Sequence, residues 1–375
     1  MPQEIKKQTI VIASILKPVD DTRAFEKMAA SLAGLGHQVF LIGQPGKTPD
    51  SGHPLIKFLP LVPFKRLSFS RALASLWAAQ KIHQVKPNIL IVNTHELLIV
   101  AVLNRILFGA RILYDIQENY AQNILNTNAF PRLIRSSLAG WVRLKEKATA
   151  LLFHHFLLAE KSYEKELLFL GKKYSVVENK VRRPLGFVRM PDPQKLKLIF
   201  TGTLAENTGV FRAIDVAKRL HEIDPKVELE IVGFCAQART LQGVKQHIEN
   251  HPYITLIGGA ELVPHARILE RIASANFGII SYPLLPYLTN KMPTKLYEYI
   301  GLELPFLLTN NRPWVNFAAQ FNAAVVIEFD QIDAYRTLEA MRTQPFYSKG
   351  MSSADQISWE TEEMKFVSAV TTPLP

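Results

Sequence analysis

Short apolar runs alternate with longer stretches of helical periodicity along the whole chain. In the first half, runs rich in Ile, Val, Leu and Phe end at polar residues or glycine, as strands do. The predicted strands are Thr9–Ser14, Gln38–Gly43, Ile89–Asn93, Arg111–Asp115, Leu151–Ala159 and Tyr174–Glu178. Apolar residues at helical spacing predict helices at Thr22–Leu35, Phe69–Gln84, Glu96–Leu107 and Arg132–Ala148. Because the strands are apolar throughout and helices join them, we expect a parallel sheet covered on both faces.

The same pattern restarts after a proline-rich break. Arg182–Gly186 and Pro191–Pro193 form the break, and Gly209–Glu222 is the next predicted helix. The strands predicted in the second half are Lys197–Thr201, Glu228–Val232, Tyr253–Ile257, Asn276–Ser281, Pro305–Thr309 and Ala324–Ile327. A last periodic segment, Ser353–Val370, predicts a terminal helix.

The length of the chain, 375 residues, exceeds what a single hydrophobic core usually serves. We therefore expect an α/β protein of two doubly wound, Rossmann-like parallel-sheet domains, residues 1–185 and 186–354. Sheets of this class bind ligands beyond the carboxyl ends of their strands, so two of them facing a central cleft can hold two substrates. Neither half opens with the Gly-x-Gly-x-x-Gly sequence typical of nicotinamide-dependent oxidoreductases, which disfavours that class.

The net charge of +11 is unevenly distributed. Residues 1–185 carry a net charge of +13, and the remaining residues carry −2. Such asymmetry indicates an anionic partner, either nucleic acid or a membrane surface, and a merely solubilising basic face is the alternative. Nucleic acid is the less favoured partner because no recognition-module motif is present.

Cysteine content and apolar runs indicate the compartment. The single cysteine, Cys235, excludes a disulfide framework and a cysteine-rich metal site, and we expect it in the core. The first apolar run, Ile10–Ile15, has only the length of a strand and no cleavage pattern follows it. The longest apolar stretch, Leu97–Leu113, is interrupted by Asn104, Arg105, Gly109 and Arg111, so no membrane-spanning helix is expected. We expect a cytoplasmic protein, and the missing export signal disfavours a periplasmic binding protein.

The most informative segment is Asn290-Lys-Met-Pro-Thr-Lys-Leu-Tyr-Glu-Tyr-Ile-Gly-Leu-Glu-Leu-Pro305. Pro293 suits the first turn of a helix, whose N-terminal N–H groups and positive dipole end attract an anion. Lys295 adds a cation, and the carboxylate of Glu298 can accept hydrogen bonds from two vicinal hydroxyls. The segment thus predicts a diphosphate-plus-ribose site, and an ordinary capped helix with a surface Lys and Glu is the alternative.

This segment resembles the donor-binding segment of the retaining GT-B glycosyltransferases of family 4, the group 1 transferases. The similarity lies in the pattern Asn-x-x-Pro-x-Lys-Leu-x-Glu-Tyr followed by Gly301 and Pro305. The resemblance implies that Glu298 holds the ribose of a nucleotide-sugar donor. The donor-binding residues that it implies in this segment are Asn290, Pro293, Thr294, Lys295, Leu296 and Glu298.

The resemblance extends over nearly the whole chain. The further similar segments are Asp21–Arg23, Leu32–Val39, Lys86–Glu96, Tyr114–Asn119, Phe200–Gly209, Leu229–Gly233 and Trp359–Glu360. They imply an acceptor-binding domain over residues 1–185, rejoined by a terminal helix at about residues 355–375, and a donor-binding domain over residues 186–354. Gly202, Thr203 and Gly209 would bind the donor at the opening of the second domain.

Four positions depart from the family pattern. Gln117 stands where many relatives have a His that contacts the reacting sugar, and Asn290 stands where the family often has a second Glu. Thr203 and Thr208 stand where relatives often have an Arg and a Lys for the diphosphate. Lys291, Lys295 and Arg212 are the cations available to replace them. These departures motivate an alternative function, a degenerate GT-B domain that binds a nucleotide-sugar or glycan without turnover.

Sugar transfer requires stabilisation of the departing diphosphate, which cations and helix N-termini provide. No metal or other cofactor is expected, since no Asp-x-Asp pair occurs in the chain. The resemblance implies retention without a protein nucleophile. Gln117 can donate to a sugar hydroxyl while its backbone carbonyl supports the anomeric charge. Glu118, Asp115, Asp21 and His95 are candidates for orienting the acceptor, with helix capping as the alternative for Asp21 and packing at a strand end for His95.

Cations accompany large apolar residues in two segments, Phe58–Arg71 and Phe130–Lys145. In the second they recur at helical spacing, which is typical of a helix lying on an anionic bilayer; its members include Arg132, Arg135, Trp141, Arg143 and Lys145. A helix packing its apolar face on its own sheet is the alternative. We therefore expect a glycosyltransferase that acts at the inner face of the cytoplasmic membrane, on a lipid-linked or polysaccharide acceptor of bacterial cell-surface glycan synthesis.

Overall fold

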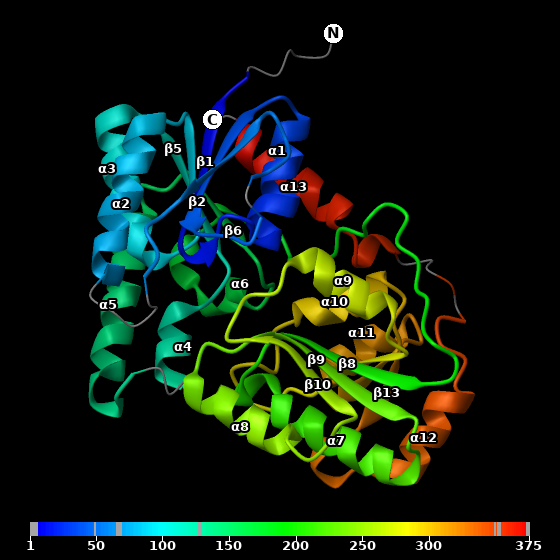
Figure 1. Ribbon diagram of the computed structural model, residues 1–375. Coiled ribbons are helices and arrows are strands. Elements are labelled where there is room, and N and C mark those ends of the chain that lie inside the picture. The colour runs from blue at the N-terminus through cyan, green and yellow to red at the C-terminus, as the bar shows by residue number, and fades with distance from the viewer. Residues whose placement is uncertain are drawn as a thin grey trace. The chain divides into compact units, whose positions relative to one another are not determined.

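Every strand that the structure describes lies in one of two all-parallel sheets. The computed structural model describes residues 7–48, 50–64, 70–126, 130–348, 350 and 354–372. The chain forms two compact units (Figure 1), Met1–Asn179 with Trp359–Pro375 (unit 1) and Lys180–Ser358 (unit 2). The two doubly wound parallel-sheet domains expected from the sequence are therefore confirmed.

Unit 1 contains a seven-stranded sheet of order β3-β2-β1-β4-β5-β6-β7. Its strands are β1 (Thr9–Pro18), β2 (Gln38–Gln44), β3 (Ile56–Pro60), β4 (Ile89–Val92), β5 (Arg111–Ile116), β6 (His155–Leu158) and β7 (Tyr174–Val176). Its helices are η1 (Thr22–Ala29), α1 (Ala30–Gly34), α2 (Ser70–Val85), η2 (His95–Leu97), α3 (Leu98–Phe108), α4 (Tyr120–Asn126), α5 (Arg132–Ala150), α6 (Tyr163–Glu166), η3 (Leu168–Leu170) and α13 (Trp359–Thr371).

Unit 2 contains a six-stranded sheet of order β10-β9-β8-β11-β12-β13. Its strands are β8 (Leu196–Thr203), β9 (Val227–Phe234), β10 (Ile254–Gly259), β11 (Phe277–Ile280), β12 (Phe306–Thr309) and β13 (Ala324–Ile327). Its helices are η4 (Glu206–Thr208), α7 (Val210–Ile223), α8 (Ala238–Ile248), α9 (His265–Ala273), α10 (Thr294–Gly301), α11 (Arg312–Ala319), η5 (Phe329–Gln331), α12 (Ala334–Thr343) and η6 (Ala354–Gln356). None of the described helices in either unit is long and apolar enough to cross a membrane.

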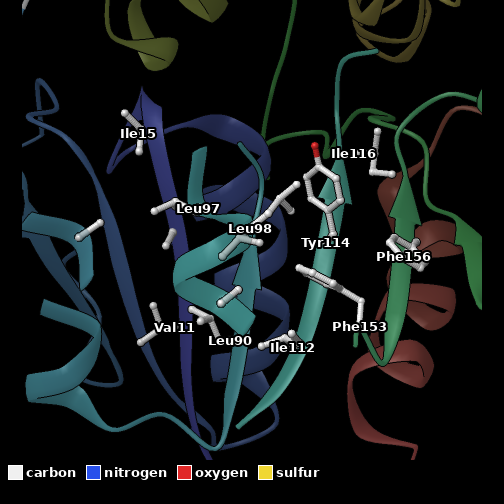
Figure 2. Close-up of a cluster of buried hydrophobic side chains, with 14 of the residues drawn as sticks. Val11, Ile15, Leu90, Leu97, Leu98, Ile112, Tyr114, Ile116, Phe153 and Phe156 are labelled. Atoms are coloured by element: carbon white, nitrogen blue, oxygen red, sulfur yellow. The ribbon is translucent and has the colours of Figure 1, made fainter. Parts of the chain in front are cut away.

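Alternation of side chains along the strands of unit 1 builds a hydrophobic core on each face of its sheet. On one face, buried residues of β1, β4, β5 and β6 meet the start of α3 (Figure 2). There Phe153 lies between two other rings, stacked on Phe156 at 5.8 Å and tilted against Tyr114 at 6.0 Å between ring centroids. The opposite face packs against η1, α1 and α13. Burial on both faces explains why the strands are apolar throughout.

Several elements differ from the sequence expectation. The predicted strand Leu151–Ala159 is shorter, because Leu151 and Leu152 are exposed in the turn that ends α5 and the strand begins only at His155. The predicted helix Thr22–Leu35 begins as a π-helix and becomes α-helical at Ala30. The strand β3 was missed, and so were the helices α4, α6, α8, α9, α11 and α12. The edge strand β3 has five residues, ends in proline and is only partly buried, so its apolar signal is weak.

The proline-rich segment expected to separate the halves belongs to unit 2. The chain passes from unit 1 to unit 2 at Asn179–Lys180, a few residues before the expected boundary. Arg189 fixes the following segment, since its guanidinium donates to the backbone oxygens of Glu303 and Ala275 at 2.7 Å each. These bonds hold the segment against unit 2 and explain why the boundary precedes it.

The terminal helix α13 packs on unit 1, although it follows unit 2 in the sequence. In Figure 1 it lies beside α1, the first α-helix of the chain. The indole of Trp359 is fully buried, contacts Phe366, and donates from Nε1 to Ser31 Oγ at 3.1 Å. Glu362 accepts a hydrogen bond from the backbone N–H of Glu178 at 2.9 Å. The helix therefore completes the core on one face of the first sheet.

Replacing Trp359 with alanine should lower the free energy of unfolding by about 3–5 kcal/mol, because it leaves a cavity in a closed core. Urea denaturation followed by circular dichroism measures the change. Trp141→Ala is the matched control, since Trp141 is 55% exposed and its loss should change the free energy by about 0.5 kcal/mol or less. Equal effects of the two variants would contradict the packing of α13.

Candidate functional site

The order of strands in unit 2 reverses between β8 and β11, and this reversal locates a candidate site. From β8 the sheet continues through β9 to β10, and from β11 it continues in the other direction through β12 to β13. Open α/β sheets bind ligands at such a switch point, beyond the carboxyl ends of the strands. Both segments singled out in the sequence follow these two strands: Gly202–Gly209 follows β8, and Asn290–Glu298 follows β11.

Close backbone approach at the switch point requires glycine. Gly209 has φ +83°, and a Cβ there would lie 2.0 Å from the backbone oxygen of Ser281. The hydroxyl of Ser281 donates to the backbone oxygen of Gly209 at 2.8 Å, which ties the start of α7 to the end of β11. Gly202 has φ +95°, and a Cβ there would lie 3.3 Å from Cε of Lys295. The missing side chain of Gly202 leaves room for that lysine.

Lys295 is buried at this edge, and its amine has no hydrogen-bond partner among the residues that the structure describes. Its Nζ lies 3.7 Å from the centroid of the Phe200 ring and 5.5 Å from that of Tyr282, in cation–π contacts. Burial lowers the pKa of the Lys295 amine to about 7, while the nearby Glu298 carboxylate acts in the opposite direction. The amine therefore loses much of its positive charge near neutral pH, and an anionic ligand would restore it.

Glu298 lies one helical turn after Lys295 and is paired. His265, the first residue of α9, places Nε2 3.1 Å from Oε1 of Glu298. Glu298 is 16% exposed, so the carboxylate is held by its partner and still reaches the surface. An oriented carboxylate of this kind can accept hydrogen bonds from hydroxyl groups.

The structure places the other predicted donor residues in different surroundings. Pro293 was expected in the first turn of the helix, and it is the N-cap residue, directly before the first residue of α10. The N–H of Leu296 donates to the carbonyl oxygen of Pro293 at 2.9 Å. Leu296 itself is fully buried in the core, so its side chain faces away from any ligand. Thr294 and Asn290 are exposed, and Lys291 lies with Nζ 5.9 Å from the centroid of the Tyr287 ring.

Two residues near the start of α7 use their polar groups within unit 2. The hydroxyl of Thr208 donates to the backbone oxygen of Thr203 at 2.7 Å and accepts from Ala205 N–H at 3.1 Å, which shapes the loop. The guanidinium of Arg212 is ion-paired with Asp330, with Nε to Oδ1 at 2.8 Å. To bind a phosphate, Arg212 would have to break its ion pair with Asp330.

In unit 1 the strand order reverses between β1 and β4, and the four predicted catalytic residues follow β1, β4 and β5. Asp21 follows β1 and caps η1, since its Oδ1 accepts from the N–H groups of Arg23 at 3.1 Å and Ala24 at 3.0 Å. His95 follows β4, and Gln117 and Glu118 follow β5, the strand beside β4. The four residues predicted from the sequence therefore lie at the same edge of the first sheet, beyond the carboxyl ends of its strands.

His95 is held in a buried polar cluster (defined as Arg71, His95, Glu96 and Lys145). Lys145 Nζ donates to Nδ1 of His95 at 3.1 Å, and Nε2 of His95 lies 3.6 Å from Glu96 Oε2. Burial lowers the pKa of His95 to about 4, the cations Lys145 and Arg71 act in the same direction, and Glu96 opposes them. His95 is therefore a neutral imidazole whose hydrogen is on Nε2, and its Nδ1 is already used.

Gln117 and Glu118 also have partners. Gln117 Nε2 donates to Asp115 Oδ2 at 2.8 Å, and the hydroxyl of Tyr163 donates to the backbone oxygen of Gln117 at 3.2 Å. That carbonyl was expected to support the anomeric charge, and it already accepts one hydrogen bond. Glu118 Oε2 accepts from Asn123 Nδ2 at 3.0 Å.

The expected membrane face on α5 is only partly exposed. Arg132 is exposed, and Trp141 is 55% exposed, but Arg143 and Lys145 point into the domain. Arg143 donates to Glu146 Oε2 at 2.9 Å and to Asn119 Oδ1 at 2.6 Å, and Lys145 bonds to His95. Arg135 is half-buried and donates to the backbone oxygen of Phe130. This corrects the expectation for Arg143 and Lys145, which stabilise the buried carboxylates and amides beneath the helix. Of the first basic segment, Phe58–Arg71, residues 65–69 lie outside the described residues.

Comparison with known proteins was informative only at the level of structure. No protein-family model matches the sequence, and no curated protein matches it. A sucrose-phosphate synthase from Thermosynechococcus elongatus is 13% identical, with a TM-score of 0.68 over 96% of this chain and 97% of its own. HepE from Anabaena, solved with UDP and glucose, is 11% identical, with a TM-score of 0.65 over 98% and 100%. The catalytic domain of starch synthase IV from Arabidopsis thaliana, bound to ADP and acarbose, is 12% identical, with a TM-score of 0.59 over 96% and 99%.

These solved structures are GT-B glycosyltransferases. The chain has the GT-B fold. Both Rossmann-like domains of this GT-B protein match the neighbours over nearly their full length, which agrees with the extent of the resemblance found in the sequence.

Sequence reasoning missed several residues of the candidate site in this GT-B protein. Phe200 and Tyr282 form the aromatic surroundings of Lys295, and His265 is the partner of Glu298. Phe200 begins a recognised segment, but its contact with Lys295 had no local signal, and no local motif marks Tyr282 or His265, because the fold brings these residues together from different elements. Arg23 was part of a recognised segment, but its ion pair with Asp115 across 92 residues of sequence had no local signal.

His95→Gln should make the stability of the GT-B protein less dependent on pH. The folded-state pKa of His95, about 4, lies below the unfolded value of 6.5, so the unfolded chain binds more protons between these values. Stability is then full above pH 6.5 and falls as the pH falls toward 4, by about 2 kcal/mol between pH 7 and pH 5 at 1.36 kcal/mol per pKa unit. Urea denaturation at both pH values should show a loss that is about 2 kcal/mol smaller in His95→Gln than in the wild type, and the remaining pH dependence comes from other groups such as His154, whose pKa burial also lowers to about 4. The control is His83→Gln, at an exposed histidine, and an unchanged pH dependence in His95→Gln would contradict the assignment.

Proposed function

We propose that the protein is a retaining glycosyltransferase that moves a sugar from a nucleotide-diphosphate sugar to a lipid-linked or polysaccharide acceptor of bacterial cell-surface glycan synthesis. The observation that carries the proposal is the buried amine of Lys295 at the switch point of unit 2, which has no hydrogen-bond partner in the described part of the chain. Burying an amine without a partner is unfavourable, and an anion bound there would compensate for it.

The donor would be held by residues of α10 and of the loop after β8. Lys295 would meet the diphosphate, with the N-terminal end of α10 adding its positive dipole end. Glu298, oriented by His265, would accept hydrogen bonds from the vicinal hydroxyls of the ribose. Gly202 and Gly209 would let the ligand approach the backbone closely. The nucleotides in the solved neighbours, UDP in HepE and ADP in starch synthase IV, support a nucleoside diphosphate as the ligand.

The chemical step would depend on electrostatic stabilisation of the leaving diphosphate, supplied by Lys295 and the helix N-terminus rather than by a metal. The sequence resemblance supports retention without a protein nucleophile. On unit 1, the carboxamide of Gln117 would contact the reacting sugar, and Glu118 and Asp21 would orient the acceptor. His95 would contribute only through Nε2–H, since its Nδ1 is bonded to Lys145.

A degenerate domain that binds the same donor without turnover is the second candidate. The observation that favours it is the ion pair between Arg212 and Asp330. Arg212 was expected to replace a phosphate-binding cation of the family, and this ion pair already uses its charge. The two candidates share the donor site and differ in catalysis, so a turnover assay separates them.

Lys295→Met should weaken the binding of a nucleoside diphosphate by about 1–3 kcal/mol, the range for losing a charge-assisted bond. In the wild type, affinity should be full below pH 7 and fall as the pH rises through the Lys295 pKa of about 7, because binding must then take up a proton. Calorimetry with UDP, ADP and GDP between pH 6 and 9 measures both effects, and protons taken up appear as a dependence of the heat on the buffer.

Lys226→Met is the matched control, because Lys226 is exposed just before β9, at the opposite edge of the same sheet. Its affinity and its pH dependence should equal those of the wild type. If none of the three nucleotides binds the wild type, the donor site is refuted. If one binds but none of the corresponding glucose nucleotides is consumed, with or without a glycan acceptor, the degenerate domain becomes the better reading.

We further propose that unit 1 docks on an anionic membrane surface through α2, α3 and α5. Helix α3 contacts both α2 and α5, and Figure 1 shows the three on the same side of the first sheet. Their exposed large apolar residues are Leu73, Leu76, Ile99, Leu103, Ile106, Leu107, Phe108, Leu133, Ile134, Trp141 and Leu144. Arg132 and Lys147 are exposed cations on α5. Because Arg143 and Lys145 point inward, apolar insertion would supply more of the binding energy than charge.

The protein should float with anionic liposomes and not with neutral ones, and less so at high salt, since each basic residue near the surface contributes about 1 kcal/mol and is screened. The double variant Leu133→Ser/Trp141→Ser should lose flotation, because both side chains are exposed, at 96% and 55%. The control is Met364→Ser, on α13 at the other face of the sheet, where the residue is 71% exposed. Flotation that survives the double variant would exclude this face as the docking surface.

A further inference from the structure

A buried ion pair lies at the carboxyl edge of the first sheet, beside the residues proposed to bind the acceptor. The guanidinium of Arg23, on η1, binds the carboxylate of Asp115, on β5, with both groups about fully buried at 2% and 1% exposure. Arg23 Nε lies 3.2 Å from Oδ1 and 3.0 Å from Oδ2, and Nη2 lies 2.7 Å from Oδ1. Burying such a pair has a large desolvation penalty, which close contacts on several atoms must offset.

The pair determines the orientation of the Gln117 carboxamide. Asp115 and Gln117 are two residues apart in an extended segment, so their side chains lie on the same face. The Asp115 carboxylate also accepts a hydrogen bond from Gln117 Nε2 at 2.8 Å. An ionised carboxylate can only accept, so the nitrogen of the carboxamide, not its oxygen, must face Asp115. The half-buried Gln117 side chain therefore keeps Oε1 as its unused acceptor, since none of the described residues donates to it.

The backbone on both sides of this chain of contacts is also fixed. Asp21 Oδ1 accepts from Arg23 N–H and caps η1, and the hydroxyl of Tyr163 donates to the backbone oxygen of Gln117. The segment η1 is π-helical, a rare geometry that is frequent at functional sites. Arg23 Nη1, in contrast, is buried without a partner among the described residues, which is unfavourable for stability alone.

We propose that Arg23 is a positioning residue that acts through Asp115 to hold the carboxamide of Gln117 with Oε1 toward the substrate. In this arrangement Oε1 accepts a hydrogen bond from a sugar hydroxyl and disfavours an anionic group at the same place. Asp21 then serves the reacting sugar indirectly, by fixing the backbone that carries Arg23. The proposal rests on the proposed glycosyltransferase function for the identity of the ligand, but not for the positioning itself.

The positioning can be tested without turnover. The protein labelled with 15N-glutamine should show a slowly exchanging side-chain amide that is assigned to Gln117 by its absence from Gln117→Ala. In Arg23→Lys the cation remains but its planar fork is lost, so this amide should exchange about tenfold faster, equivalent to about 1.4 kcal/mol. Unchanged exchange in Arg23→Lys would overturn the proposal, whether or not the protein transfers sugars.

Turnover gives the second test, with consumption of UDP-glucose, ADP-glucose or GDP-glucose as the readout. Arg23→Lys should lower kcat about tenfold and leave KM for the nucleotide-sugar nearly unchanged. In the Gln117→Ala background the same substitution should have no further effect, because its action passes through Gln117. An equal loss in both backgrounds would mean that Arg23 is merely structural and would overturn the proposal.

Gln117→Glu provides a variant that does not disturb the buried pair. Asp115 would repel the new carboxylate, so the side chain should turn away from its native position. The variant should therefore lose as much activity as Gln117→Ala, although its side chain still carries acceptor oxygens. Full activity of Gln117→Glu would overturn the proposal. If the wild type consumes no nucleotide-sugar while the Gln117 amide is protected in the expected way, the proposed function fails and the positioning stands.

Discussion

Both sheets of this protein are entirely parallel, and a parallel sheet has to be covered on both faces. Apolar side chains therefore fill most positions of the strands, and the polar groups of the candidate site lie near the carboxyl ends of the strands, as Asp115 does on β5, or just beyond them. Residues at the end of a strand differ sharply from those that follow it. Val92 and Ile116 are fully buried in the core, while His95, three residues after Val92, and Gln117, directly after Ile116, form side-chain hydrogen bonds. The reversal of strand order in each sheet then concentrates these polar residues at one place.

The two buried cations at these edges illustrate different physical situations. Arg23 is neutralised by a carboxylate that belongs to the fold, so it keeps its charge and fixes the geometry around it. Lys295 is buried beside two aromatic rings, and no described residue forms a hydrogen bond with its amine; burial lowers its pKa to about 7. The first arrangement orients neighbouring groups, whereas the second leaves a site whose charge depends on what binds there.

The exposed face of α5 shows how one helix can serve two purposes. Its inward side carries Arg143, Lys145 and Glu146, which complete hydrogen bonds with Asn119, His95 and Tyr114. Its outward side carries Leu133, Trp141 and Leu144. The inward side also carries the buried apolar residues Ala139 and Val142, so polar and apolar side chains share it, and the polar ones are paired because they are largely buried.

The sequence by itself determined the class of fold, the alternation of strands and helices, and the segments that end at the carboxyl edges. Periodicity is a local property, and Asp21, His95, Gln117, Gly202, Lys295 and Glu298 could be selected because each follows an apolar strand or opens a helix. Only the tertiary structure decided what each of them contacts. Lys295 acquired aromatic neighbours from β8 and from the end of β11, Glu298 acquired His265, and Arg23 acquired Asp115 across 92 residues of sequence. Burial, pairing and pKa depend on groups that are distant along the chain, so no local pattern encodes them, and strand order alone brings them together.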